Sequence, residues 1–198
     1  METGPPIEHR PWMGEQYCLG IEGQRIAIVG HSHWRTIDEK DTDDYTQMVL
    51  NEVIRGARVR FFPYIRGYFG GISNDFWQHV MFFNLLPECL PEDMKDSEGT
   101  EVQVKRAKDR FDGLIANTMP PPQKILVFTR KGWSNIPWKQ NEERKALGPD
   151  FPPFFVWGVH QAGASKAMVF GLRHPQGAKG RLLRVAVRTI LDMPLVDC

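Results

Sequence analysis

The sequence has little cysteine and no long apolar run. No stretch of its 198 residues approaches the ~20 apolar residues that a membrane-spanning helix requires, so we expect no membrane partner. The three cysteines, Cys18, Cys89 and Cys198, are odd in number, widely spaced and form no CxxC pair. This pattern argues against a disulfide framework, a structural zinc site and a four-cysteine iron–sulfur site. Because residues 1–12 also lack the apolar stretch of a secretory signal, we expect a cytoplasmic protein.

Acidic residues are missing from one long part of the chain. Residues 151–191 contain no Asp or Glu, although the whole sequence has 25 Lys and Arg against 24 Asp and Glu. A one-sided basic region is typical of a phosphate-binding surface, and a solvated face without a partner is the alternative. The basic side chains of this stretch are Lys166, Arg173, Lys179, Arg181, Arg184 and Arg188.

The motifs of several common enzyme classes are also missing. The sequence contains no GxxxxGK[ST] phosphate loop, no GxGxxG dinucleotide fingerprint and no GxSxG nucleophile elbow. Short apolar runs are present instead, each bounded by turn residues, as is typical of buried strands. These runs are residues 25–30, 80–84, 125–129 and 167–172, with 154–157 as a candidate extra strand.

Helical patterns alternate with these runs. They cover residues 43–55, a short segment through Trp77 and His79, residues 100–117 and residues 181–191. Residues 59–71 are aromatic and basic but too broken by proline and glycine to form one element. The alternation predicts a single α/β domain over residues 25–198, a three-layer α/β/α sandwich with a mostly parallel central sheet. We expect residues 1–24 to be an irregular or loosely packed entry segment, and nothing demands more than a monomer.

The residues that follow each strand are the candidates for chemistry, because ligands bind at the carboxyl ends of parallel strands. The first strand leads into Gly30-His-Ser-His-Trp34, the second ends at Asn84, and the last leads into Arg173-His-Pro175. His31 and His33 are a candidate metal pair, but no third ligand lies at an obvious spacing, so we expect no metal. Ser32 beside two histidines is a candidate nucleophile, although no orienting carboxylate is identifiable.

In their order along the chain, these segments resemble the uracil-DNA glycosylase superfamily, and most nearly a divergent branch of it. Ile26 to Trp34 resembles its first motif, a strand followed by a Gly-led water-activating loop. Residues 80–84 resemble its second strand, whose terminal Asn reads the pyrimidine edge, and residues 125–129 its third. Residues 169–175 resemble its last strand, which ends in a His-Pro motif. The resemblance spans about residues 25–190.

The resemblance implies a monofunctional N-glycosylase that removes a flipped deaminated base, uracil first, from DNA in base excision repair, with no cofactor. Asn84 would pair with the Watson–Crick edge of the base. His174 would donate a hydrogen bond to the base carbonyl and stabilise the leaving anion. Phe69 is implied as the stacking ring, with Tyr68 the alternative. Trp34 falls where the family places a bulky residue that limits the size of the pocket.

The loop after the His-Pro motif is implied to enter the DNA groove. Its residues are Gly177, Lys179 and Arg181, and Arg173 precedes it as a further DNA contact. The wedge position falls on Ala178 or Lys179 rather than on a bulky apolar residue. This favours single strands, mismatches or already unpaired bases.

One departure from the family concerns the attacking water. Ser32 stands where the best-known branch has an Asp that orients the water. His31 or His33 takes that role, the backbone and Ser32 hold the water, or hydrolysis is feeble. Two alternatives therefore stay open. One is a catalytically weak or inactive member that binds nucleic acid or a base, and the other is an unrelated Ser/His hydrolase.

Overall fold

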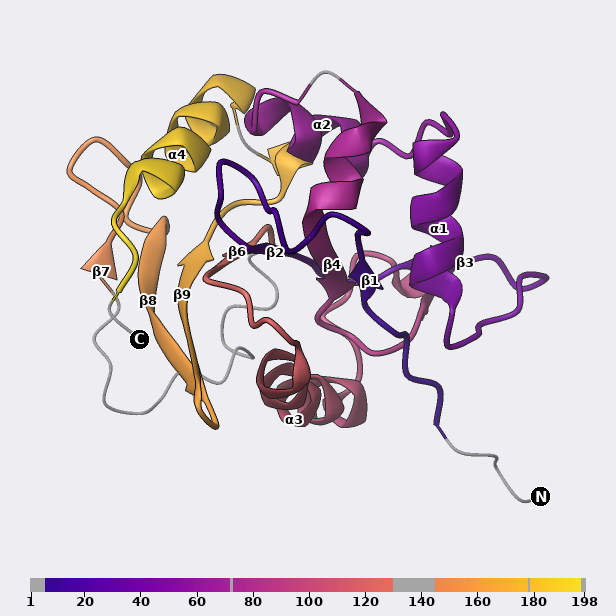
Figure 1. Cartoon of the computed structure of the whole chain (residues 1–198). Helices are drawn as coiled ribbons and strands as arrows, with labels where there is room; N and C mark the ends of the chain where they lie inside the picture. The colour runs from indigo at the N-terminus through magenta and orange to yellow at the C-terminus, as the bar shows by residue number, and fades with distance from the viewer. Residues whose placement is uncertain (1–5, 72, 130–144, 178, 197–198) are drawn as a thin grey trace.

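The computed structural model describes residues 6–71, 73–129, 145–177 and 179–196 (Figure 1). Its centre is a seven-stranded sheet in the order β1-β4-β2-β6-β9-β8-β7. The strands are β1 Trp12–Met13, β2 Ile26–Gly30, β4 Val80–Asn84, β6 Lys124–Val127, β7 Lys145–Ala146, β8 Val156–Ala162 and β9 Ser165–Gly171. The middle four, β4, β2, β6 and β9, are parallel, whereas β1, β8 and β7 pair antiparallel. The prediction of a mostly parallel central sheet is therefore confirmed.

Helices cover both faces of the sheet, which makes three layers (Figure 1). One face carries α1 (Tyr45–Ile54), α2 (Phe61–Tyr68) and α4 (Gly180–Asp192), and the other carries α3 (Glu101–Asn117). Short 3-10 helices cover Asn74–His79, Glu92–Met94 and Pro175–Gly177. In the part of the chain that the structure describes, no helix is both long and apolar enough to cross a membrane.

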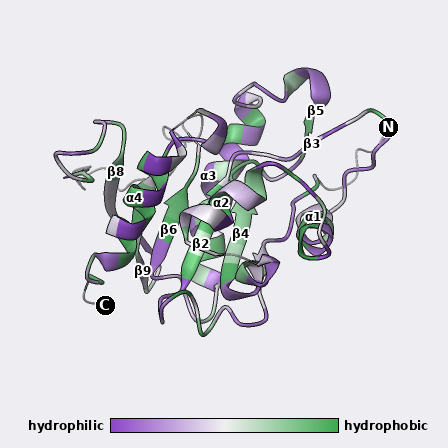
Figure 2. Ribbon diagram, turned by 90° about the horizontal axis from the view of Figure 1, so that it is seen from above, coloured by the Kyte–Doolittle hydropathy of each residue, from purple (hydrophilic) through white to green (hydrophobic). Residues whose placement is uncertain are grey.

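The alternation of side chains along each strand explains the layers. Ile28 and Leu126 point into the cluster under α1, α2 and α4, whereas their neighbours Ala27 and Val127 point into the cluster under α3. Both sets are apolar because both faces are covered. Figure 2 shows the same pattern, with the middle strands hydrophobic and the outer side of α4 hydrophilic.

Two predictions about the fold were wrong. Residues 59–71 do contain one regular element, α2, because Pro63 falls in the first turn of the helix, where no N–H is needed for the helical ladder. The N-terminal segment is also packed rather than loose. Trp12 lies in β1 and donates its indole N–H to the carbonyl of Trp77 at 2.8 Å, and Tyr17 is 2% exposed.

The edges of the sheet are less regular than its middle. β8 begins at Val156, two residues later than the predicted extra strand, and pairs with β9 along seven residues. A second, two-stranded sheet joins β3 (Trp34–Arg35) to β5 (Leu90–Pro91) in parallel. The wedge candidate Ala178 lies outside the described residues.

Candidate active site

Asn84 lies at the carboxyl end of β4, opposite Gly30 at the end of β2. It is 5% exposed, and its side chain passes directly over the Gly30 backbone. A Cβ atom at position 30 would overlap Asn84 Oδ1, so glycine is what allows this approach. The sequence pairs a glycine-ended strand with an asparagine-ended strand, and the parallel register brings the two ends together.

The backbone of Asn84 is held in place while its side-chain amide is not. Arg110 on α3 donates from Nη1 to the Asn84 carbonyl at 2.9 Å, and the Leu85 N–H donates to the Gly30 carbonyl at 3.1 Å. Within the described residues, the Asn84 amide itself makes no hydrogen bond. The amide atoms are not among the fully buried side-chain atoms that lack a partner, so a ligand or water can reach them. The amide is therefore a candidate ligand-binding group.

His174 follows β9 at the same carboxyl-terminal end of the parallel strands, three residues beyond the last residue of β9. Its Nδ1 accepts a hydrogen bond from the Gln176 N–H at 3.3 Å. Accepting at Nδ1 requires the neutral ring to carry its proton on Nε2. This tautomer is the one that the role implied by the resemblance requires.

Phe61, the first residue of α2, links the His174 end of the sheet to the Asn84 end. Its half-buried ring lies 5.6 Å from the His174 ring and 6.0 Å from the Phe82 ring, between ring centroids. Phe82 precedes Asn84 by two residues and therefore shares its face of the sheet. β4 and β9 are three strand spacings apart, about 14 Å, so Asn84 and His174 follow strands at the same end of the sheet but are not neighbours.

Of the two aromatic residues expected to stack on a base, Tyr68 lines the cleft beside Pro175 and Gln176, whereas Phe69 packs on a neighbouring ring. Phe69 and Tyr68 are at the opposite end of α2, about 12 Å from Phe61 along the helix axis. Tyr68 is buried and stacks on Phe128 at 6.4 Å, and Phe69 packs against Phe76 at 5.1 Å. Sequence reasoning missed Phe61 because the aromatic run was not recognised as a helix, and only the helix shows which ring reaches His174.

The loop that follows β2 is fixed to the chain that follows β4. Backbone N–H groups of Leu86 and Leu90 donate to the carbonyls of His31 and His33, each at 2.9 Å. His31 donates from Nε2 to the Ser97 carbonyl at 3.0 Å, and Ser32 is half-buried between the two histidines. The loop is thus a rigid wall beside Asn84.

His33 turns toward α1 rather than toward His31. Its Nε2 lies 3.1 Å from Thr46 Oγ1, and its ring lies 5.3 Å from the Tyr45 ring. Burial, together with the neighbouring His9, lowers the pKa of His33 to about 3, so the imidazole is neutral. Because the Nε2 atoms of the two histidines have different partners, they do not form the metal pair considered from the sequence.

Trp34 is on the surface. It is 49% exposed, and Lys95 Nζ lies 5.5 Å from the centroid of its ring. This cation–π contact is an ordinary use of an exposed indole. In the described part of the chain, no ring contact joins Trp34 to His174 or Phe61, so the structure does not bring it into the candidate site.

A basic groove runs over α2 and α4 next to His174. One part is a cleft of about 520 Å³ that includes Pro175, Gln176 and Tyr68, and the other is a cleft of about 490 Å³ on the α1 side. Pro63 and Tyr64 line both clefts, and Tyr64 is 50% exposed. The described residues that line the groove include no Asp or Glu. Its arginines are Arg58, Arg60, Arg66, Arg181 and Arg184.

The expected DNA contacts fall partly in this groove. Arg181 lines it, and Lys179 is exposed as the residue that precedes α4. Gly177 ends the 3-10 helix that begins at Pro175. Arg173 is half-buried, with its guanidinium 5.9 Å from the Phe154 ring, and Arg188 is paired with Glu22 and Asp192 outside the groove.

No protein-family model and no curated protein matches the chain. The residues at the carboxyl ends of the strands are therefore the guide to function. Their geometry combines an amide without a hydrogen bond in the described residues, an imidazole whose Nδ1 accepts from the backbone, an aromatic ring in contact with that imidazole and an adjacent basic groove.

Proposed function

We propose that the protein is a DNA glycosylase that hydrolyses the N-glycosidic bond of a flipped deaminated base, with uracil as the first substrate to test. The side-chain amide of Asn84 carries this proposal, because it makes no hydrogen bond within the described residues although the residue is only 5% exposed. A primary amide offers one acceptor and one donor side by side. These groups complement the N3–H donor and O4 acceptor on the Watson–Crick edge of uracil.

His174 and Phe61 would complete the recognition of the base. Nε2–H of His174 would donate to the second base carbonyl, and the Phe61 ring would stack on a base held between Asn84 and His174. When the bond between the base nitrogen and C1′ breaks, its electron pair leaves with the base. A hydrogen bond from His174 is strongest at that stage, when the carbonyl carries negative charge, so it lowers the barrier.

The attacking water would add to the sugar carbon and lose its proton. The loop of residues 31–33 contains no carboxylate to orient that water. The electron-poor sugar needs only a weak nucleophile, so a water held by Ser32 and the loop backbone suffices for slow hydrolysis. The products are the free base and an abasic site, with no metal or organic cofactor required by the chemistry.

The basic groove supports nucleic acid as the substrate. Its arginines would contact successive phosphates, and the exposed Tyr64 ring offers a surface on which an unpaired base stacks. The groove adjoins Pro175, so a strand lying in it passes next to His174. Single-stranded DNA is therefore the substrate form that we expect to bind best.

The test is release of base from labelled oligonucleotides, single- and double-stranded, that carry one uracil, hypoxanthine or xanthine. Alkali then reveals abasic sites. Asn84→Ala and His174→Ala should lower the rate by roughly 10²-fold or more, as removal of a transition-state hydrogen bond does. Cys18→Ser, a change of an exposed residue, is the control. No release from any substrate by folded protein would contradict the proposal.

The second candidate function is that of a glycosylase-like protein that binds DNA or a base with little or no turnover. The missing carboxylate in the water loop favours it. It predicts salt-sensitive binding without base release. The Ser32 hydrolase is less well supported, because no hydrogen bond joins Ser32 to His31 or His33 in the described residues.

A further inference from the structure

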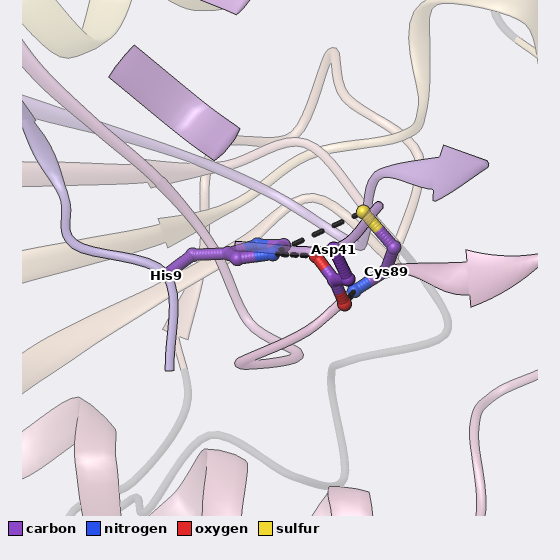
Figure 3. Close-up of side chains that lie close together, drawn as sticks. All are labelled: His9, Asp41 and Cys89. Carbon is purple, nitrogen blue, oxygen red and sulfur yellow. Dashed lines mark hydrogen bonds and ion pairs between the residues drawn. The ribbon is translucent and has the colours of Figure 1, made fainter. Parts of the chain in front are cut away.

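Three side chains of metal-binding type converge behind the candidate site (Figure 3). His9 comes from the N-terminal segment, Asp41 from the loop before α1, and Cys89 from the residue that precedes β5. His9 Nε2 lies 2.6 Å from Asp41 Oδ1 and 3.9 Å from Cys89 Sγ. The three ligand atoms all lie within 4.8 Å of one another.

The cluster is buried. His9 is 2% exposed, Cys89 is 5% exposed, and the side chain of Asp41 is 7% exposed. The Cys89 N–H donates to Asp41 Oδ2 at 2.9 Å, which orients the carboxylate so that Oδ1 faces His9. Outer contacts of this kind orient the ligands in metal sites.

We propose that His9, Asp41 and Cys89 bind one zinc ion. A nitrogen, an oxygen and a sulfur ligand together are characteristic of zinc, whereas magnesium and calcium prefer oxygen alone. Three protein ligands leave the fourth tetrahedral position for water. The proposal is independent of the proposed glycosylase activity.

The two separations that involve His9 are close to those of a tetrahedral site, and the third lies within 4.8 Å. With ordinary Zn–N, Zn–O and Zn–S bond lengths, ligand atoms are separated by about 3.4 Å for nitrogen and oxygen and by about 3.6 Å for nitrogen and sulfur. The His9–Asp41 pair would have to open by less than ~1 Å and the His9–Cys89 pair to close by less than ~0.5 Å. Side-chain rotations are enough for shifts of this size.

Metal binding would exchange protons for the ion. His9 Nε2 now donates to Asp41, and on binding its proton would be lost or carried by Nδ1. The Cys89 thiol would release its proton to solvent, because the ligand is the thiolate. The charges of one thiolate and one carboxylate then balance the two positive charges of zinc.

A zinc ion here would fasten three distant parts of the chain. His9 and Asp41 are 32 residues apart, and Asp41 and Cys89 are 48 apart. The ring of His33 lies 5.7 Å from that of His9, so the ion would stiffen the wall of the candidate site without entering it. Wide separation in sequence is also why spacing motifs did not indicate this site.

The experiment is titration of the tag-free, chelator-treated whole chain with cobalt(II), the spectroscopic substitute for zinc. We expect one ion per chain and a thiolate-to-cobalt charge-transfer band that added zinc abolishes. Cys89→Ser should remove the band, and Asp41→Asn, which keeps the thiol, should weaken binding by roughly tenfold or more. The control replaces both Cys18 and Cys198 by serine and should leave the band unchanged.

The outcomes are distinct. No band in the folded wild-type chain, or a band that survives Cys89→Ser and is lost in the control, overturns the proposal and leaves a hydrogen-bonded cluster. If Cys89→Ser does not fold, Asp41→Asn and the control still decide. Base-release assays in excess chelator report on the glycosylase separately, so failure of one proposal is distinguishable from failure of the other.

Discussion

The side-chain amide of Asn84 rests on the Cα of Gly30, in the space that a β-carbon at position 30 would fill. The two residues are partners in the parallel register of β2 and β4. The orientation of the candidate base-reading group is therefore set by the absence of a side chain on the neighbouring strand.

Gly30→Ala should consequently displace the Asn84 amide while the fold survives. We expect base release to fall by roughly tenfold or more, since an edge contact that moves by an ångström loses its alignment. Gly113→Ala is the matched control, because no atom lies within 4 Å of a β-carbon there. That control should stabilise α3 by up to about 1 kcal/mol, measured by urea denaturation. Equal activity in both variants would show that Asn84 does not read the base.

Phe61 and Phe69 should respond differently to truncation. Phe61→Ala removes the ring beside His174 and should lower base release by roughly tenfold or more, because stacking contributes about 1–3 kcal/mol per base. Phe69→Ala removes a ring packed on Phe76 and should lower the melting temperature with a smaller change in the rate. The reverse pattern would restore Phe69 as the stacking residue.

Arg110→Met should destabilise the protein. The Arg110 guanidinium donates to the carbonyls of Asn84 and His9 and lies 3.3 Å from a carboxylate oxygen of Glu8. Each buried carbonyl left without a donor costs about 1–3 kcal/mol. The free energy of unfolding in urea gives the measurement. Lys108→Met, at an exposed position on the same helix, should change it by less than about 0.5 kcal/mol.

The basic groove should set the salt dependence of DNA binding. Arg60→Gln and Arg181→Gln each remove a positive charge that would neutralise a phosphate of a bound single strand. The slope of log K against log salt should therefore flatten by about 0.7 in each variant. Arg188→Gln is the control, because that guanidinium is already paired with Glu22 and Asp192. An equal change in the control and the groove variants would mean that binding follows net charge rather than the groove.

The parts of the fold that depend on local apolar pattern were predictable from the sequence. Residues 80–84 form the expected strand. Residues 101–117 form the expected helix, which begins with a capping box between Thr100 and Gln103. α2 was missed because proline and glycine were counted as helix breakers without regard to position, although Pro63 lies where a helix tolerates it.

The candidate site was predictable only where it follows the ends of strands. Asn84 and His174 lie at the edge of the sheet that the strand pattern indicated. Phe61 approaches that edge through a helix, and His9 reaches Asp41 through a segment judged irregular. Contacts between such distant residues come from the packing of elements, which periodicity within a single element does not reveal.

Both ends of the seven-stranded sheet are closed by strands of only two residues, β1 and β7. β1 lies along β4, a strand buried over its whole length, and so covers backbone groups that would otherwise be open to pairing. So short an edge strand offers little template for a strand of another molecule. We therefore expect that removing the N-terminal segment would expose the edge of β4 and favour aggregation.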